Sequence, residues 1–446
     1  MMRRLLFRAF GLTFLAERWI RRRFTTAGLL ALGATAAAAV VGLDTNRTLA
    51  YQAFTFLVAL LTVAMAASLS FRGRFSVRRL LPHFATAGEP LAYRVVIRNE
   101  TARVQAGLTL MDETADPRPA FEELLRAREP GEERRNWFDR TVGYPRWMWL
   151  IGRNQRAWIP EVPLPALSPR GDGEARVEIV PLRRGPLRLM AVTLARSDPL
   201  GLFRARVTVS APQSVLVLPR RYPVPALALP GPRKYQQGGV ALAASVGDSE
   251  EFVALRDYRP GDPVRRIHWK SWARAGRPVV KEFQDEFFVR HALVLDTFAA
   301  PEEGARFEEA VSVAASFACA APTQDALLDL MFVGAEAYCF TAGRGLAHTD
   351  RMLEILACVE PATGLSFRAL RDAVMERHAS LSGCICVLLG WDDERRDLVG
   401  RLGALGVPAL VLVIGDGAGA PEQETDGAAA VHWLQVGRIA EGLQRL

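Results

Sequence analysis

The sequence predicts an α/β domain built on a parallel sheet, preceded by a β-sandwich and an N-terminal transmembrane helical hairpin. Three observations predict these parts. Two uncharged apolar spans lie near the N-terminus, short alternating segments fill the middle of the chain, and apolar strands alternate with amphipathic helices in its last third. At 446 residues the chain is also too long for one ordinary domain. We therefore expect two soluble modules and a membrane anchor.

Composition is consistent with a partly membrane-embedded protein. Half of the residues are hydrophobic, and the formal net charge is +8. A basic excess suits either nucleic acid or anionic lipid. Much of the positive charge flanks the apolar spans, which favours lipid.

Residues 1–23 form a basic, amphipathic N-terminal segment in which apolar side chains are interleaved with arginines. Such a segment suits the inner face of a membrane. A disordered basic tail is the alternative, and the sequence leaves both open.

Residues 24–71 contain two spans without a charged side chain, Phe24–Leu43 and Leu49–Leu69. Each has about the length needed to cross a hydrocarbon core of roughly 30 Å. Only a short turn separates them, so we expect two transmembrane helices that form a hairpin. The first span is rich in Ala and Gly, which suits close helix packing.

Positive charge on both outer flanks of the hairpin predicts its orientation. Both termini, and everything after Phe71, are expected in the cytoplasm, which makes the chain a multi-pass inner-membrane protein. A cleaved signal peptide with its site at Ala36–Ala38 is an alternative, but the second span would then face the wrong way. The arginines concerned are Arg3, Arg4, Arg8, Arg18, Arg21, Arg22 and Arg23 before the hairpin, and Arg72, Arg74, Arg78 and Arg79 after it.

Residues 74–218 predict a β-sandwich, because segments such as Leu91–Asn99 alternate with period two between Gly, Pro and Asp. An insert near residues 115–165 contains Trp147, Trp149 and Trp158 mixed with Arg. Two interpretations stay open for it: an interfacial patch that touches the bilayer, or a loop packed on the sandwich.

Residues 219–250 form a Pro- and Gly-rich linker, and the α/β domain is expected over residues 291–446. Nearly continuous apolar strands separated by amphipathic helices indicate a parallel sheet covered on both faces. Sites in such folds lie beyond the carboxyl ends of the strands. Strands are expected at His291–Phe298, Cys384–Gly390 and Ala409–Gly415, and helices at Phe307–Ala321, Arg351–Val359, Phe367–His378, Glu394–Leu405 and Arg438–Leu446.

The cysteines predict reduced, buried thiols of a cytosolic fold and no disulfide framework. Cys384 and Cys386 alternate on an expected strand, so they should share one face. The five cysteines are Cys319, Cys339, Cys358, Cys384 and Cys386.

Residues 251–290 carry the most informative segment of the chain. Eight Arg or Lys share the window Glu251–Glu286 with tyrosine, tryptophan and histidine. This mixture predicts a half-buried segment whose rings dock on the fold while its arginines pair with carboxylates or bind an acidic surface. A Pro-Gly-Asp turn should place R-R-I-H-W-K on an extended piece. The expected interaction residues are Arg256, Asp257, Tyr258, Arg259, Pro260, Gly261, Asp262, Arg266, Ile267, His268, Trp269, Lys270 and Arg274.

The run L-R-D-Y-R-P-G-D, followed by R-R-I-H-W-K, resembles the signature of the bacterial family called domain of unknown function 58 (DUF58). A second stretch, Arg183–Phe203, is similar to the family's upstream D-P-x-G-L-F element. The resemblance implies a membrane-tethered protein with a von Willebrand factor A-like domain, which has a Rossmann-type parallel sheet. It also implies a MoxR-type AAA+ ATPase, or its client, as the protein partner.

Von Willebrand factor A domains often bind Mg2+ through an Asp-x-Ser-x-Ser loop, and the resemblance permits a test of that site. Asp296 matches, but Phe298 and Ala300 occupy the serine positions and offer no side-chain oxygen. Thr363 and Asp392 are the remaining candidate ligands. We expect no cofactor and no metal, with Asp296 as a cap of its strand end; a Mg2+ site is the alternative.

No phosphate loop, His-Glu-x-x-His or Gly-x-Ser-x-Gly motif occurs in the chain. We therefore expect a non-enzymatic, protein-binding adaptor, anchored to membrane lipid, that presents its strand-end face and outward arginines to a partner. Nucleic acid is not the expected partner. The alternatives are an enzyme or metal-dependent factor of cell-envelope processing with the strand-end aspartates as acid and base, and nucleic-acid binding through the basic-aromatic segment.

Overall fold

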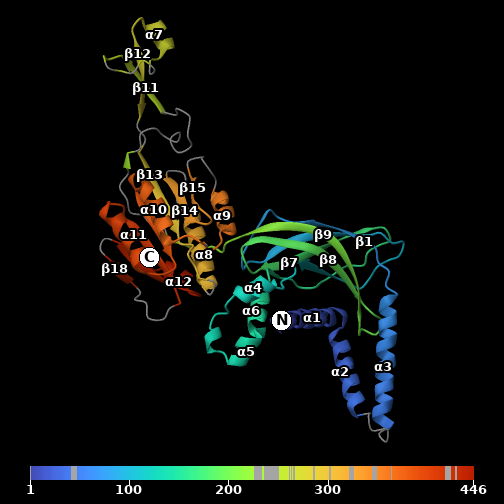
Figure 1. Ribbon diagram of the computed structural model, residues 1–446. Helices are drawn as coiled ribbons and strands as arrows, with labels where there is room; N and C mark the ends of the chain where they lie inside the picture. Colours follow the sequence, from blue (N-terminus) through green and yellow to red (C-terminus); the bar gives the residue numbers. More distant parts are fainter. Residues whose placement is uncertain are drawn as a thin grey trace. The chain divides into compact units, whose positions relative to one another are not determined.

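The computed structural model describes residues 2–41, 48–225, 234–235, 251–260, 262, 264, 267–284, 287–300, 303–320, 326–343, 349–362, 364–416, 423–426 and 429–446. The chain divides into two compact units, Met1–Leu218 and Pro219–Leu446. Unit 1 contains the N-terminal helices and two β-sheets, and unit 2 contains a mixed α/β sheet and a two-stranded hairpin (Figure 1).

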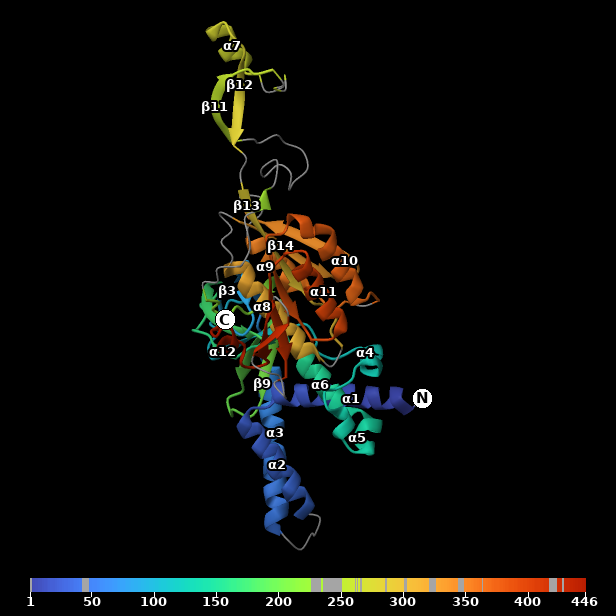
Figure 2. The ribbon, with the colours of Figure 1, turned by 90° about the vertical axis from the view of Figure 1, so that its left-hand side faces the viewer.

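Three helices open unit 1: α1 (Met2–Arg23), α2 (Thr26–Val41) and α3 (Thr48–Leu69). In both views α2 and α3 run side by side as a helical hairpin (Figures 1 and 2). Among the described residues, α3 alone is long and apolar enough to cross a membrane, over Leu49–Leu69. The 16 residues of α2 rise by only about 24 Å at 1.5 Å per residue. A helical hairpin is therefore present, and one of its two described helices reaches the length of a span. That both helices cross a membrane stays a prediction.

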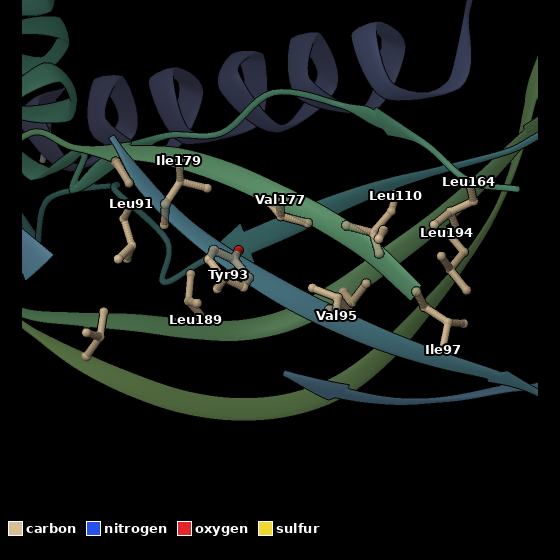
Figure 3. Close-up of a cluster of buried hydrophobic side chains, with 14 of the residues drawn as sticks. Leu91, Tyr93, Val95, Ile97, Leu110, Leu164, Val177, Ile179, Leu189 and Leu194 are labelled. Carbon is tan, nitrogen blue, oxygen red and sulfur yellow. The ribbon is translucent and has the colours of Figure 1, made fainter. Parts of the chain in front are cut away.

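The β-strands of unit 1 form two sheets around one apolar core. The strand orders are β1-β3-β7-β5 and β2-β9-β8-β4-β6. Along β3 every second side chain is buried, and Tyr93, Val95 and Ile97 meet residues of the other sheet such as Leu110 and Leu189 (Figure 3). The strands are β1 (Phe75–Leu80), β2 (Phe84–Thr86), β3 (Leu91–Asn99), β4 (Leu108–Thr114), β5 (Ala157–Trp158), β6 (Val162–Pro163), β7 (Asp172–Pro181), β8 (Gly185–Ser197) and β9 (Arg204–Leu218).

The tryptophan-rich insert is helical and packs on α1. Trp147 is 1% exposed, with its ring centroid 5.9 Å from that of Phe10 and 5.7 Å from that of Phe14. Trp147 is therefore buried against α1, whereas Trp158 is exposed. The interpretation of the insert as a loop is wrong, because it is mostly helical, and contact with a bilayer stays a prediction. The insert contains α4 (Phe121–Arg126), η1 (Glu132–Arg134), α5 (Trp137–Val142) and α6 (Tyr144–Asn154).

The main sheet of unit 2 has the order β15-β14-β13-β16-β17-β19-β18, and the short β10 pairs with β13. The five central strands are parallel, whereas β15 and β18 are antiparallel at the edges. The expectation of a parallel sheet is thus correct for its centre and wrong for its edges. The turn of three residues between β14 and β15 is too short for a crossover and enforces an antiparallel neighbour.

Helices cover both faces of this sheet, with α8 and α9 on one side and α10 and α11 on the other (Figure 2). The strands are β10 (Lys234–Tyr235), β13 (Phe287–Leu295), β14 (Ala326–Val333), β15 (Ala337–Ala342), β16 (Gly383–Leu388), β17 (Ala409–Gly415), β18 (Gln423–Asp426) and β19 (Ala429–Gln435). The helices are α8 (Gly304–Ala320), α9 (Thr349–Cys358), α10 (Phe367–Arg377), η5 (His378–Ser380), α11 (Asp393–Ala404) and α12 (Ile439–Leu443). Each of the expected helices and strands of this domain is found to within a few residues.

All five cysteines are free. Cys384 and Cys386 are buried with their sulfur atoms 3.5 Å apart, so they share one face of β16 as expected. Cys319 and Cys358 are exposed at the ends of α8 and α9, so the expectation of burial is wrong for them.

Candidate functional site

The first candidate site lies at the carboxyl ends of β13 and β16. The chain leaves β13 toward β14 on one side and later returns to β16 on the other, so this is the point where the strand order reverses. Asp296 follows β13 here and is fully buried. Its Oδ1 accepts a hydrogen bond from the Phe298 amide, and its Oδ2 accepts one from the Leu389 amide, both at 3.0 Å. Asp296 thus joins the two loops, as expected of a strand-end cap.

A guanidinium group also binds the Asp296 carboxylate. Arg395 of α11 donates to Asp296 Oδ2 from Nε at 2.7 Å and also bonds Asp392. Asp392 is the N-cap of α11 and accepts from the Arg395 amide at 3.0 Å. Burial raises the pKa of the Asp296 carboxyl, and the ion pair with Arg395 opposes that rise. Sequence reasoning missed Arg395, although its position three residues after Asp392 on a helix was a usable signal.

The residues at this strand end do not fit a Mg2+ ion. Phe298 packs edge-on against Phe367 at 5.9 Å, and the Arg395 guanidinium lies over the same ring at 4.9 Å. The lone pairs of Asp296 that would face a cation already bind Arg395 and two amides. No group of three His, Cys, Asp or Glu occurs among the residues that the structure describes. Thr363 lies outside the described residues.

The second candidate site is the basic-aromatic segment, which forms a hairpin of β11 (Glu251–Asp257) and β12 (Val279–Gln284) with α7 (Trp269–Ala275) between them. The Ile267 backbone pairs with Val280, which is buried, and the His268 amide donates to the Val279 carbonyl at 2.8 Å. The expectation of an extended R-R-I-H-W-K is wrong at its end, because Trp269 and Lys270 begin a helix. We call β11, α7 and β12 the signature hairpin.

Carboxylates neutralise part of the hairpin's positive charge. Arg256 makes two hydrogen bonds to Asp262, at 2.7 and 2.8 Å, and Arg277 pairs with Asp257 at 2.9 Å. The guanidinium hydrogen bonds of Arg256 and the Arg259 amide lower the pKa of Asp262 to about 2. The expected charge network is therefore present, whereas Gly261 and Arg266 lie outside the described residues.

One aromatic residue of the signature hairpin, Trp269, is more exposed than expected. Trp269 is 61% exposed and stacks on Trp272 with ring centroids 5.1 Å apart. The expectation that this ring docks in a buried position is therefore wrong. The His268 ring forms a hydrogen bond with Ser271 Oγ at 2.7 Å, at the start of α7. Lys270, Arg274 and Arg259 are exposed.

The D-P-x-G-L-F element of unit 1 joins the β-sandwich to the helical hairpin. Asp198 accepts hydrogen bonds from the amides of Leu200, Leu202 and Phe203 at 3.1, 2.7 and 2.8 Å and so shapes a tight loop. This loop packs on the start of α2: the Thr25 amide donates to the Leu202 carbonyl at 3.0 Å. Sequence reasoning identified the motif without assigning it this role.

A glycine makes the close approach possible. A Cβ atom on Gly28 would overlap the carbonyl oxygen of Leu202, and the rings of Phe24 and Phe203 lie 4.4 Å apart. Ala64 of α3 is buried in the same cluster. The loop therefore holds both helices of the hairpin against the sandwich.

A charge cluster that sequence reasoning missed fixes the end of α1 on the sandwich. Glu113 of β4 accepts from Arg22 at 3.0 Å, from Arg206 at 2.9 Å and from Thr193 at 2.6 Å. Desolvation opposes ionisation of Glu113, but the Thr193 hydrogen bond and the Arg22 guanidinium together lower its pKa. Arg22 was interpreted only as topology charge, and here it is also a structural contact.

Parts of the chain are similar to known proteins. Residues 254–396 match the family model described as "Protein of unknown function DUF58". Over this region the chain is similar to the DUF58 family. It is 27% identical over 184 residues to "Uncharacterized protein YeaD" of Bacillus subtilis (strain 168), which covers 40% of this chain. The chain spans only 44% of the length of that relative.

Among solved structures, the CARDB domain of a Pyrococcus furiosus protein is 10% identical, with a TM-score of 0.15, and covers 31% of this chain and 94% of that domain. A GH20 exo beta-N-acetylglucosaminidase from Vibrio harveyi is also 10% identical, with a TM-score of 0.16, and covers 78% of this chain and 58% of the enzyme. The Asp296 cluster and all of the signature hairpin except its first three residues lie within the DUF58 match.

Proposed function

We propose that this protein is a non-enzymatic, membrane-anchored adaptor that binds a protein partner through the signature hairpin. The observation that carries the proposal is the stack of the exposed Trp269 on the half-buried Trp272, with the exposed cations Lys270 and Arg274 on the same short helix. Tryptophan and arginine are the residues enriched in the energetic centres of protein interfaces. An exposed ring of this size contributes little to the fold, so its use is in binding.

The strand-end cluster supports the non-enzymatic part of the proposal. Asp296 and Asp392 are the carboxylates that an acid–base mechanism would use, and both bind Arg395. A carboxylate whose oxygens already accept hydrogen bonds from a guanidinium is poorly placed to exchange a proton with a substrate. The reversed strand order at Asp296, with Phe298 in place of a serine, fits a von Willebrand factor A-like domain whose metal site is degenerate.

The membrane part of the proposal rests on the α2–α3 hairpin. Helix α3 is long and apolar enough to cross a membrane, and α2 packs beside it (Figure 1). We propose that both helices cross the inner membrane, with arginines on both outer flanks holding the two units in the cytoplasm.

We propose a MoxR-type AAA+ ATPase, or its client, as the partner. The test is binding of the purified MoxR-type ATPase to the full-length chain in lipid nanodiscs. Trp269→Ala should weaken binding by about 30-fold, the equivalent of a 2 kcal/mol hot spot. The matched control is Trp137→Ala, which removes a ring that is 76% exposed in unit 1. Equal affinities for the two variants would refute the hairpin as the binding site.

Nucleic-acid binding is the second candidate, because exposed tryptophans beside cations also suit stacked bases and phosphates. It predicts that the chain binds single-stranded DNA with an affinity that falls steeply with salt. The adaptor proposal would be replaced by this one if the ATPase does not bind the chain and if Trp269→Ala abolishes the binding of single-stranded DNA.

A further inference from the structure

A groove lies between α1 and the helical insert of unit 1. Its volume is about 530 Å³, within the range of small-molecule sites. Phe7, Gly11, Leu12 and Leu15 line it from α1, and Trp147 lines it from α6. Gly11 has no side chain to fill the space: a Cβ atom there would meet only Arg118 Nη1, at 4.0 Å.

The helix α1 is apolar on two opposite sides, and one of them is largely exposed. Phe7, Phe10 and Phe14 pack on the insert. Leu5, Leu12 and Trp19, spaced by seven residues and thus nearly two turns apart, remain exposed, and Leu12 is 67% exposed. A helix with such an apolar stripe and many arginines is typical of the surface of a bilayer. Leu12 belongs to both this stripe and the groove, so the groove opens where lipid would lie.

The charge of the groove favours an anion. Arg8 lines it and forms no ion pair or hydrogen bond with any residue that the structure describes. Arg118 also lines it and pairs with Asp116 at 2.5 Å. Two arginines and one aspartate leave a net charge of +1, with the charge of Arg8 uncompensated. A single anionic group would compensate it.

One buried donor in the groove lining lacks an acceptor. Trp147 is 1% exposed, and its indole N–H has no hydrogen-bond partner in the described part of the chain. A buried donor without a partner costs about 1–3 kcal/mol, so native proteins usually provide one. A phosphate or ester oxygen would be such an acceptor.

We propose that this groove binds one anionic phospholipid from the bilayer, with an acyl chain along Leu12 and Leu15 and the phosphate at Arg8. The apolar lining takes the chain, the uncompensated cation takes the phosphate, and the lipid oxygens offer the indole its acceptor. This inference goes beyond the adaptor role and needs only that the chain meets a membrane. A bound lipid would also hold α1 and the insert together at the bilayer surface.

Native mass spectrometry of the full-length chain in detergent, titrated with phosphatidylglycerol, tests the proposal. The wild type should retain one phosphatidylglycerol, and Gly11→Leu, which fills the groove, should lower its affinity at least 10-fold. Gly152→Leu is the control. Gly152 lies on α6 and does not line the groove, and a Cβ atom there would meet no heavy atom within 4 Å. Phosphatidylcholine, which has no net charge, should bind at least 10-fold more weakly.

Arg8→Gln provides a second variant at an exposed position that the fold does not need. It should reduce phosphatidylglycerol affinity toward that of phosphatidylcholine while the melting temperature stays unchanged. Phosphatidylglycerol bound equally by the wild type and Gly11→Leu would overturn the site. Equal binding of the two lipids by the wild type would overturn the assignment of an anionic headgroup.

Discussion

Replacing Arg395 with methionine should leave the Asp296 carboxylate buried and without its counter-ion. Asp296 is fully buried and Arg395 nearly so, with the two side chains 2.7 Å apart. Breaking one partner of a buried ion pair costs about 3–5 kcal/mol, because the other charge stays in a low dielectric. Arg395→Met should therefore destabilise the sheet of unit 2 by that amount. The double variant Asp296→Asn/Arg395→Met should recover most of the loss, since it removes both charges.

Hydrogen exchange of the full-length chain, followed on peptides from β13 and β16, measures this effect where it arises. Exchange in these strands should accelerate in Arg395→Met and return toward the wild type in the double variant. Added Mg2+ should not change the exchange rates of either variant. Two results would refute the idea that a guanidinium occupies the place of a metal. One is that Arg395→Met exchanges at the rate of the wild type, and the other is that Mg2+ restores protection in this variant.

Three further outcomes are expected. Trp269→Ala should change the free energy of unfolding by less than about 0.5 kcal/mol in thermal melts, since exposed positions contribute little; a loss of 3 kcal/mol would mean that the ring is buried. Gly28→Val should separate α2 from the Leu202 carbonyl and increase proteolysis of the loop of residues 198–203. Gly33→Val is the control, since a side chain there enters open space and should not change the cleavage rate. Equal cleavage of the two variants would contradict the packing of α2 on this loop. The folded-state pKa of Asp262 is depressed to about 2, so its stabilisation of the hairpin is complete above about pH 4 and is lost as the pH falls through 2. Exchange of the Arg259 amide between pH 4 and 2 measures this loss, and a flat profile would exclude the Arg256 pair.

Local patterns in the sequence were sufficient for most elements of the fold. Period-two alternation predicts β3 over Leu91–Asn99, and its bounds are those observed. Strand β19 was not predicted, because Ala429–Gln435 mixes small, polar and aromatic residues at the end of the sheet. The antiparallel direction of the edge strands also escaped prediction, since apolar runs do not encode direction. Loop length was the available signal, because a turn as short as residues 334–336 cannot make a crossover.

The sites depend on contacts between distant residues, which no local pattern contains. The missing serines at Phe298 and Ala300 predicted that Asp296 would be a cap, but the sequence does not place Arg395, 99 residues away, on its carboxylate. Likewise, Trp147 and Phe10 are separated by more than a hundred residues, and their pairing follows only from the folded unit. The exposure of Trp269 was missed because tryptophan in a basic segment suggests docking, and burial is a property of the tertiary structure.

The central claim is that this protein works by holding a partner through the signature hairpin. In-cell photocrosslinking from a benzoylphenylalanine at Lys270, compared with one at Asp393 on the exposed start of α11, tests it most directly. Mass spectrometry should identify a MoxR-type ATPase, or its client, joined to the position of Lys270 and absent from that of Asp393. A partner joined only through Asp393, or no adduct from the hairpin, would contradict the account.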